Sequence, residues 1–155
     1  GRDELAAMYD YGNEDMAFFI FTSPDPEEPT ISIPGVKNES SVPDETFTPN
    51  LWFRSGVGNW GGAYTRYLTS GDFNFDGRDE LGAMYDYGNE DMALFVFTAP
   101  DETFIAERWF KSGPGNWGVS NTKFVTAGDY DGDMFDEISA MYDYGNEDMA
   151  IFIFR

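Results

Sequence analysis

Hydrophobic and polar residues alternate in short runs along the chain, and these runs predict β-strands. The clearest runs lie at 65–73, 80–87, 92–98 and 104–111. In the second run Leu81, Ala83 and Tyr85 fall on one face and the residues between them on the other, which is the period of a strand. The tract Tyr-Gly-Asn-Glu-Asp that follows is typical of a tight turn. No segment has a helical period, so the sequence predicts an all-β protein.

These runs belong to internal repeats. The decapeptide M-Y-D-Y-G-N-E-D-M-A occurs three times, at 8–17, 84–93 and 141–150. The segment W-F-[RK]-S-G-x-G-N-W-G occurs twice, at 52–61 and 109–118. An acidic segment with a shared pattern also occurs twice, at 71–81 and 128–138. The period is 57 residues, and the first copy carries 19 extra residues at about 25–43, in a tract rich in Pro, Ser and Glu that is typical of an exposed loop.

The period divides the chain into three repeats, of which only the middle one is complete. We expect a first repeat at 1–76 that starts at its second strand and a second at 77–133. The third, at 134–155, stops after its third strand. Four-stranded units of this length are typical of propeller blades, so we expect propeller-like blades of four antiparallel strands, about two and a half in number. Open faces and edges at both ends favour self-association or pairing with neighbouring repeats of a longer chain.

Composition narrows the functional classes. Nine Lys and Arg residues stand against 29 Asp and Glu residues, which gives a net charge of −20 and argues against nucleic acid and anionic membranes as partners. Because the chain has no Cys and no His, disulfides, thiolate zinc sites and Ser-His catalysis are excluded. No apolar run is long enough for membrane insertion. The acids recur in every copy, whereas an active site needs an asymmetric set of groups, so we expect no enzyme activity.

The acidic segment of the first full copy has oxygen donors at regular spacing. The donors are the side chains at loop positions 1, 3, 5 and 9 and the carbonyl at position 7, which are Asp72, Asn74, Asp76, Glu80 and Arg78. Gly77 at position 6 permits a sharp bend. A donor set of carboxylate, amide and carbonyl oxygens is typical of calcium sites. An EF-hand is excluded, because position 12 is Ala83 and a predicted strand follows instead of a helix.

The second acidic segment offers a matching set. Its predicted donors are Asp129, Asp131, Asp133, Glu137 and the carbonyl of Phe135. Met134 replaces the expected glycine at position 6 and Gly132 stands at position 4, so we expect a distorted or weaker site. The simpler alternative is that both loops are Asx turns with solvated acids. Two matched copies favour calcium over that alternative, and magnesium rarely uses a cage of protein oxygens alone.

The segment G-D-F-N-F-D-G-R-D-E-L, with the following Ala-Met-Tyr-Asp-Tyr-Gly-Asn hairpin, resembles the FG-GAP/VCBS repeat family. These repeats occur in integrin-α-type β-propellers and bacterial extracellular proteins. The resemblance covers nearly the whole chain outside 25–43. It implies propeller blades, calcium at the two sets of donors above and an extracellular location. Glu80 and Glu137 stand where the family usually has Asp, and Met134 also departs from its pattern. Family members include adhesion, scaffold, lectin-like and enzyme-appended modules, so the resemblance does not select one function.

We therefore expect an extracellular, calcium-binding β-repeat protein with a structural, adhesion or assembly role, as a filament or oligomer subunit. One alternative is a carbohydrate-binding module that takes a glycan on Asn59, Trp60, Asn116 and Trp117. For both tryptophans the pattern favours packing between blades. Another alternative is an appendage of a larger secreted enzyme. Asn38 begins an Asn-Glu-Ser sequon and is a candidate glycosylation site, with a plain polar loop as the other interpretation.

Overall fold

The computed structural model describes residues 4–22 and 48–155, and their regular structure is β apart from two short 3₁₀ turns. Ten strands form three antiparallel sheets, which confirms the all-β prediction. No helix in this part of the chain is long and apolar enough to cross a membrane. The insertion expected at 25–43 and the sequon at Asn38 lie outside the described residues.

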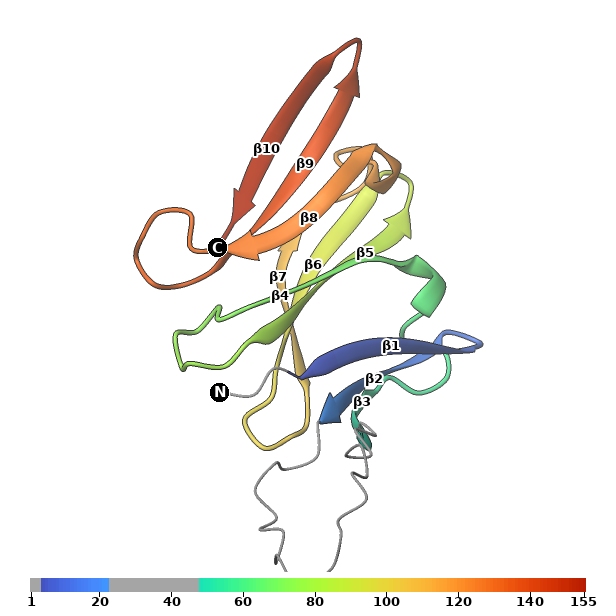
Figure 1. Ribbon diagram of the computed structural model, residues 1–155. Coiled ribbons are helices and arrows are strands. Elements are labelled where there is room, and N and C mark those ends of the chain that lie inside the picture. Colours follow the sequence, from blue (N-terminus) through green and yellow to red (C-terminus); the bar gives the residue numbers. More distant parts are fainter. Residues whose placement is uncertain (1–3, 23–47) are drawn as a thin grey trace, which may run out of the picture.

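Each sheet follows the chain order without crossovers (Figure 1). The first sheet contains β1 (Leu5–Gly12), β2 (Asp15–Thr22) and β3 (Thr48–Arg54). The middle sheet contains β4 (Thr65–Gly71), β5 (Glu80–Gly88), β6 (Asp91–Thr98) and β7 (Ile105–Lys111). The third sheet contains β8 (Thr122–Gly128), β9 (Glu137–Gly145) and β10 (Asp148–Phe154). The 3₁₀ turns, Gly62–Tyr64 and Val119–Asn121, lead into β4 and β8.

The middle sheet is the complete four-stranded unit that the sequence predicts. Its first strand ends at Gly71 instead of residue 73, because the acidic loop begins there. Its last strand begins at Ile105, because Phe104 turns into the interior and is only 6% exposed. The repeat boundaries after 76 and 133 fall inside the acidic loops, so the middle and third sheets take their first strand from the preceding repeat.

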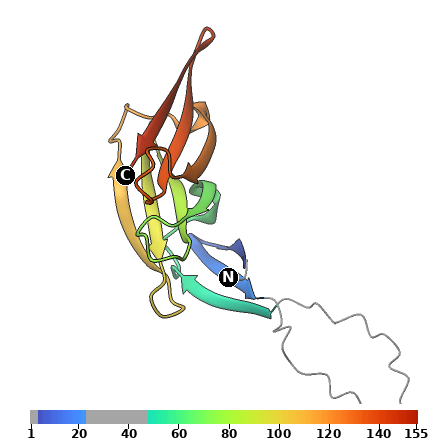
Figure 2. The same ribbon diagram turned by 60° about the vertical axis from the view of Figure 1, so that its left-hand side comes forward.

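The sheets pack face to face in an open series, which Figures 1 and 2 show from two sides. Between the first and middle sheets lies a buried cluster with Phe18, Leu81 and Phe97. A second cluster, with Met84 and Ile138, joins the middle sheet to the third. Leu81 and Met84 therefore point to opposite faces of β5, which confirms the predicted alternation. Burial of these two faces is the main stabilisation that the series provides.

The repeated decapeptide builds the same tight hairpin in all three sheets. The two turn residues have positive φ in each copy: Asn13 and Glu14, Asn89 and Glu90, and Asn146 and Glu147. This is the conformation of a two-residue type I′ turn, whose twist matches that of the paired strands. Identical sequence thus gives identical local structure, whatever the surroundings of the copy.

Candidate metal centre

The two acidic loops occupy equivalent places and touch each other. The loop at 72–80 joins β4 to β5, and the loop at 129–137 joins β8 to β9; both lie at the left of Figure 1. The rings of Phe75 and Phe135 are 5.6 Å apart between centroids. The Asp136 N–H donates to the Asp72 carbonyl at 3.0 Å, and the Asp72 N–H donates to Oδ2 of Asp136 at 2.9 Å. Any change in one loop therefore reaches the other directly.

Side-chain oxygens shape the loop at 72–80 from within. The Asp72 carboxylate accepts the N–H groups of Asp76 and Gly77 at 3.0 and 2.9 Å. The side-chain oxygen of Asn74 accepts the Asp76 N–H at 2.9 Å, and Oδ1 of Asp76 accepts the Arg78 N–H at 3.0 Å. These are Asx turns, in which the backbone wraps around carboxylate and amide oxygens. The wrapping ties Asp72, Asn74 and Asp76 to their own loop, and among the described residues the acids of this loop do not form a close group like that of the second loop.

Glu80 closes this loop as a buried acid. Its side chain accepts the Phe73 N–H at 3.0 Å and the Asn74 amide at 2.9 Å, and the residue is only 3% exposed. Burial, together with the charges of Asp76 and Asp72, raises the pKa of Glu80 to about 7, although the bond from Phe73 acts in the opposite direction. A cation among these oxygens would favour the carboxylate form and reverse the shift.

In the loop at 129–137 the carboxylate at position 1 accepts more backbone hydrogen bonds than its counterpart Asp72 does. The Asp129 carboxylate accepts three N–H groups, from Gly132 at 2.6 Å, Asp133 at 3.1 Å and Met134 at 3.1 Å. The Phe135 N–H donates to the carboxylate of Asp133 at 3.0 Å, as Arg78 does to Asp76 in the other loop. The two loops therefore share one internal hydrogen-bonding scheme.

Three of the predicted ligands in the second loop converge. Asp129, Asp131 and Glu137 each place one carboxylate oxygen within 4.8 Å of the others, and Asp133 is not part of this group. Glu137 is 2% exposed. The Arg155 guanidinium forms an ion pair with Oδ2 of Asp131. A protein cation thus already pairs with the carboxylate of one of the three converging acids.

The two loops have glycine at different positions, but their backbones have similar φ angles at both bends. In the first loop positions 4 and 6 are Phe75, with φ 57°, and Gly77, with φ 83°. In the second they are Gly132, with φ 81°, and Met134, with φ 77°. Both loops use the left-handed region twice, and each has glycine at one of the two positions. The distortion expected from Met134 is therefore absent at these bends. Each loop does hold one residue with a Cβ at positive φ, Phe75 or Met134, which is sterically unfavourable.

The tryptophans expected as sugar platforms are interior residues. Trp60 and Trp117 are 8% and 6% exposed, and their indole N–H groups donate to Thr65 and Thr122 at 2.8 and 2.9 Å. Each ring packs edge-on between the aromatic side chains of two strands of the next sheet. This burial confirms the favoured prediction, that both tryptophans pack inside the protein, and leaves no exposed stacking face for the carbohydrate alternative, because these rings fill the space between sheets. The neighbouring amides of Asn59 and Asn116 serve their own loops, donating to Ser carbonyls at 3.0 and 3.1 Å.

The donor chemistry of the two loops suits a hard divalent cation. All the side chains that converge offer oxygen, and the chain has no Cys or His to supply sulfur or imidazole. No family model, curated protein or solved structure matches this chain. Of the predicted donors, Asp129, Asp131 and Glu137 come together, whereas the contacts of Asp136 with Asp72 and of Arg155 with Asp131 were not predicted from the sequence.

Proposed function

We propose that this chain is an extracellular calcium-binding β-repeat protein of the FG-GAP/VCBS type. In this role it is a non-enzymatic structural, adhesion or assembly module. The observation that carries the proposal is the pair of loops at 72–80 and 129–137. Both have oxygen donors at positions 1, 3, 5 and 9, both use the same Asx-turn scheme, and both stand at the same place in successive sheets.

Calcium in these loops would act as a structural ion. The predicted donors include three carboxylates and one amide in the first loop and four carboxylates in the second, of which Asp129, Asp131 and Glu137 converge, and neighbouring carboxylates repel one another without a cation. A bound ion would fix the end of the first strand of a sheet to the start of the second. Because Asp72 and Asp136 bond the two loops together, ions in both would also fasten the middle sheet to the third.

Propeller-like blades are the arrangement that we infer for the sheets. The middle sheet is a four-stranded meander, and each neighbour has three strands of the same unit in the same order. Successive sheets bury their faces against each other, as blades of a propeller do. We infer affinities of roughly 10⁻⁴–10⁻³ M for these loops, the range of extracellular calcium modules, in keeping with the extracellular location that we propose.

Calcium titration of chelator-treated protein tests the proposal. We expect calorimetry to show two calcium sites and negligible heat with magnesium at the same concentration. At a calcium concentration one hundred times Kd, each site should add about 2.7 kcal/mol to the free energy of unfolding. An unchanged melting temperature and no binding heat at low salt would refute the calcium role.

Variants of single predicted ligands test whether the heat of calcium binding comes from the two loops. Asp76→Ala and Asp133→Ala should each remove one of the two sites, and the double variant should remove both. Asp101→Ala is the matched control, because Asp101 is an exposed acid outside both loops. If Asp101→Ala lowers the stoichiometry as much as the loop variants, the heat reflects non-specific attraction to a chain of net charge −20.

A further inference from the structure

Among the described residues, the third copy of the repeated hairpin has no neighbouring strand of the kind that the first two copies have. The outer edge of β2 pairs with β3, and the outer edge of β6 pairs with β7. β10 is the equivalent strand of the third sheet, and no strand of the described residues pairs with its outer edge. Because the hairpin sequence is the same in all three copies, the first two show what this edge is built to contact.

In the first two copies a buried aspartate at the end of the hairpin holds the neighbouring strand. Asp15 accepts Nη2 of Arg54 at 2.8 Å and the N–H of Gly56 at 3.1 Å. In the middle sheet Asp91 pairs with Lys111 at 3.3 Å. Asp15 and Asp91 are 2% and 6% exposed, whereas Asp148, the same residue of the third copy, is exposed. Within 4–22 and 48–155, the third hairpin therefore presents a carboxylate without the basic partner that the other two have.

A serine forms the second contact in both copies whose outer edge is paired. The Met16 N–H donates to Oγ of Ser55 at 3.0 Å, and the Met92 N–H donates to Oγ of Ser112 at 3.0 Å. Both serine N–H groups bond back to the methionine carbonyls at 3.0 and 2.9 Å. Met16 and Met92 are fully buried, and their counterpart Met149 is 59% exposed.

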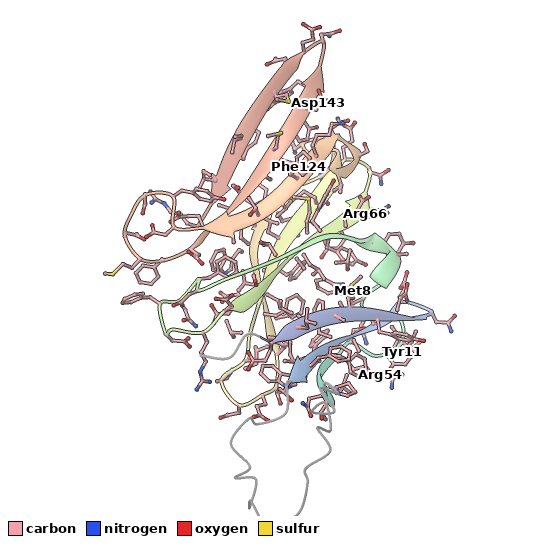
Figure 3. All side chains as sticks on the ribbon, viewed as in Figure 1. Met8, Tyr11, Arg54, Arg66, Phe124 and Asp143 are labelled. Atoms are coloured by element: carbon pink, nitrogen blue, oxygen red, sulfur yellow. The ribbon has the colours of Figure 1, made fainter. Side chains whose placement is uncertain are left out.

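The basic residue of the neighbouring strand also covers a tyrosine of the hairpin. The Arg54 guanidinium lies 4.4 Å from the centre of the Tyr11 ring, and Figure 3 labels both residues. Nζ of Lys111 lies 4.2 Å from the centre of the Tyr87 ring. The equivalent Tyr144 is 57% exposed. A cation, a hydroxyl and a tight glycine turn thus recur together at each occupied edge.

A hollow beside β10 matches a place that Phe104 fills elsewhere. The hollow measures about 480 Å³, and its lining includes Trp109 and Phe154. One repeat earlier the corresponding residues are Trp52 and Phe97, and Phe104 packs on both, with ring centroids 5.3 and 6.3 Å away. The Phe104 N–H also donates to the Trp52 carbonyl at 2.8 Å. The volume is sufficient for a phenylalanine side chain, so the hollow and the open edge fit a single occupant.

We propose that the outer edge of β10, with Asp148 and this hollow, is a docking site for an extended segment with the pattern of β7. The pattern is Phe, four further residues, then Trp-Phe, a basic residue, Ser and Gly. The segment must be a further one of this type, because β3 and β7 are already paired within the chain. Pairing of two β10 edges is disfavoured, because it would bring together chains of charge −20 with no base opposite Asp148. The inference deepens the assembly role proposed above by naming its partner, but it rests on β10 and not on calcium.

A peptide from the protein itself serves as the probe. A fluorescein-labelled peptide with the sequence of residues 101–118 is titrated with the intact chain, and fluorescence anisotropy is measured in calcium and in chelator. We expect saturable one-to-one binding that a scrambled peptide does not show. Asp148→Asn in the chain, Lys111→Glu in the peptide and Phe104→Ala in the peptide should each weaken binding at least about tenfold, since each removes a charged hydrogen bond or a buried ring. Asp101→Asn in the chain, an exposed control of equal charge change, should leave binding unchanged.

A charge exchange distinguishes docking at Asp148 from general stickiness or strand replacement. The chain variant Asp148→Lys should bind the wild-type peptide weakly and regain most affinity for the Lys111→Glu peptide. Equal binding to the wild-type chain and the Asp148→Asn variant would overturn the proposal, because the peptide would then have replaced β3 or β7. Binding no stronger than that of the scrambled peptide would overturn it too. The chain's calcium heat is unaffected by either outcome, so a failure here is distinct from a failure of the proposed function.

Discussion

The loops at 72–80 and 129–137 reach the same shape with glycine at different positions. In the first loop glycine takes the second bend and Phe75 the first; in the second loop glycine takes the first bend and Met134 the second. What the loops share is the aspartate at position 1, whose carboxylate accepts backbone N–H groups across the loop. The acceptor at position 1 therefore matters more for the fold of the loop than the place of any one glycine.

The two loops also differ in the residue at position 3 and in the partner that it contacts. At position 3 the first loop has Asn74, which donates to Glu80, and the second has Asp131, which pairs with Arg155. The second loop thus has one more acid and a built-in cation. If calcium binds there as we propose, we expect it to compete with that cation, so a higher negative charge would not translate directly into a higher affinity.

The largest effect is expected from removing the acceptor at position 1. Asp129→Ala loses three N–H partners and Asp72→Ala loses two, each worth about 1 kcal/mol net. In chelator we expect Asp129→Ala to lower the free energy of unfolding by about 2–3 kcal/mol and Asp72→Ala by about 1 kcal/mol less. Urea denaturation of both variants measures the difference. Equal costs would mean that these bonds do not set the loop shape.

The next effect tests the contact between the loops. Asp136 is not a predicted ligand, but its carboxylate accepts the Asp72 N–H. Asp136→Ala should weaken calcium binding at the other loop, 72–80, about three- to tenfold, because it frees the first donor of that loop. Asp79→Ala is the matched control, since Asp79 holds the same loop position and is exposed. The expectation fails if both variants have the same affinity at 72–80, measured by calorimetry in an Asp133→Ala background.

The sequence could predict those features that depend on residues within a single repeat. The repeat period predicted β4 to β7 to within two residues and selected the oxygen side chains at loop positions 1, 3, 5 and 9 as candidate donors, because strand alternation and turn residues act locally. It could not predict the bond from Asp72 to Asp136, which joins residues 64 apart in different repeats. The burial of Trp60 was favoured by the sequence, but its ring partners Tyr85 and Phe95, which belong to the adjacent sheet, were not predicted.

A smaller effect on the free energy of unfolding is expected from substitutions at position 6 of each loop. Met134→Gly should raise the free energy of unfolding by about 1 kcal/mol, because it relieves a residue with a Cβ at φ 77°. Gly77→Ala should lower it by a similar amount, and no atom lies within 4 Å of the added Cβ, so backbone strain alone is measured. Thermal unfolding in chelator checks both. A destabilised Met134→Gly protein would show that the exposed Met134 side chain makes contacts that outweigh its strain.

The smallest effect concerns the cation of the second loop. Arg155 and Asp131 have side chains 70% and 40% exposed, and exposed ion pairs contribute about 0.2–1 kcal/mol. Arg155→Gln should therefore raise calcium affinity at 129–137 about two- to fivefold, since calcium no longer displaces a guanidinium. Calorimetry in an Asp76→Ala background isolates that site. Arg66→Gln is the control: Arg66 pairs with Asp86 at 3.6 Å, so it removes an equal charge from an ion pair outside the two loops.

The salt dependence makes this last test decisive. A gain of general electrostatic origin would appear in Arg66→Gln as well, whereas displacement of Arg155 is a local event at one carboxylate. We expect the gain in Arg155→Gln to shrink as salt rises to about 1 M, where the Debye length is about 3 Å and the exposed pair is screened in the parent protein too. If affinity falls in Arg155→Gln at low salt, the arginine positions Asp131 for the ion instead of competing with it. In that case Arg155 would hold Asp131 in position to bind calcium. The second loop would then be more preorganised for the ion than the first.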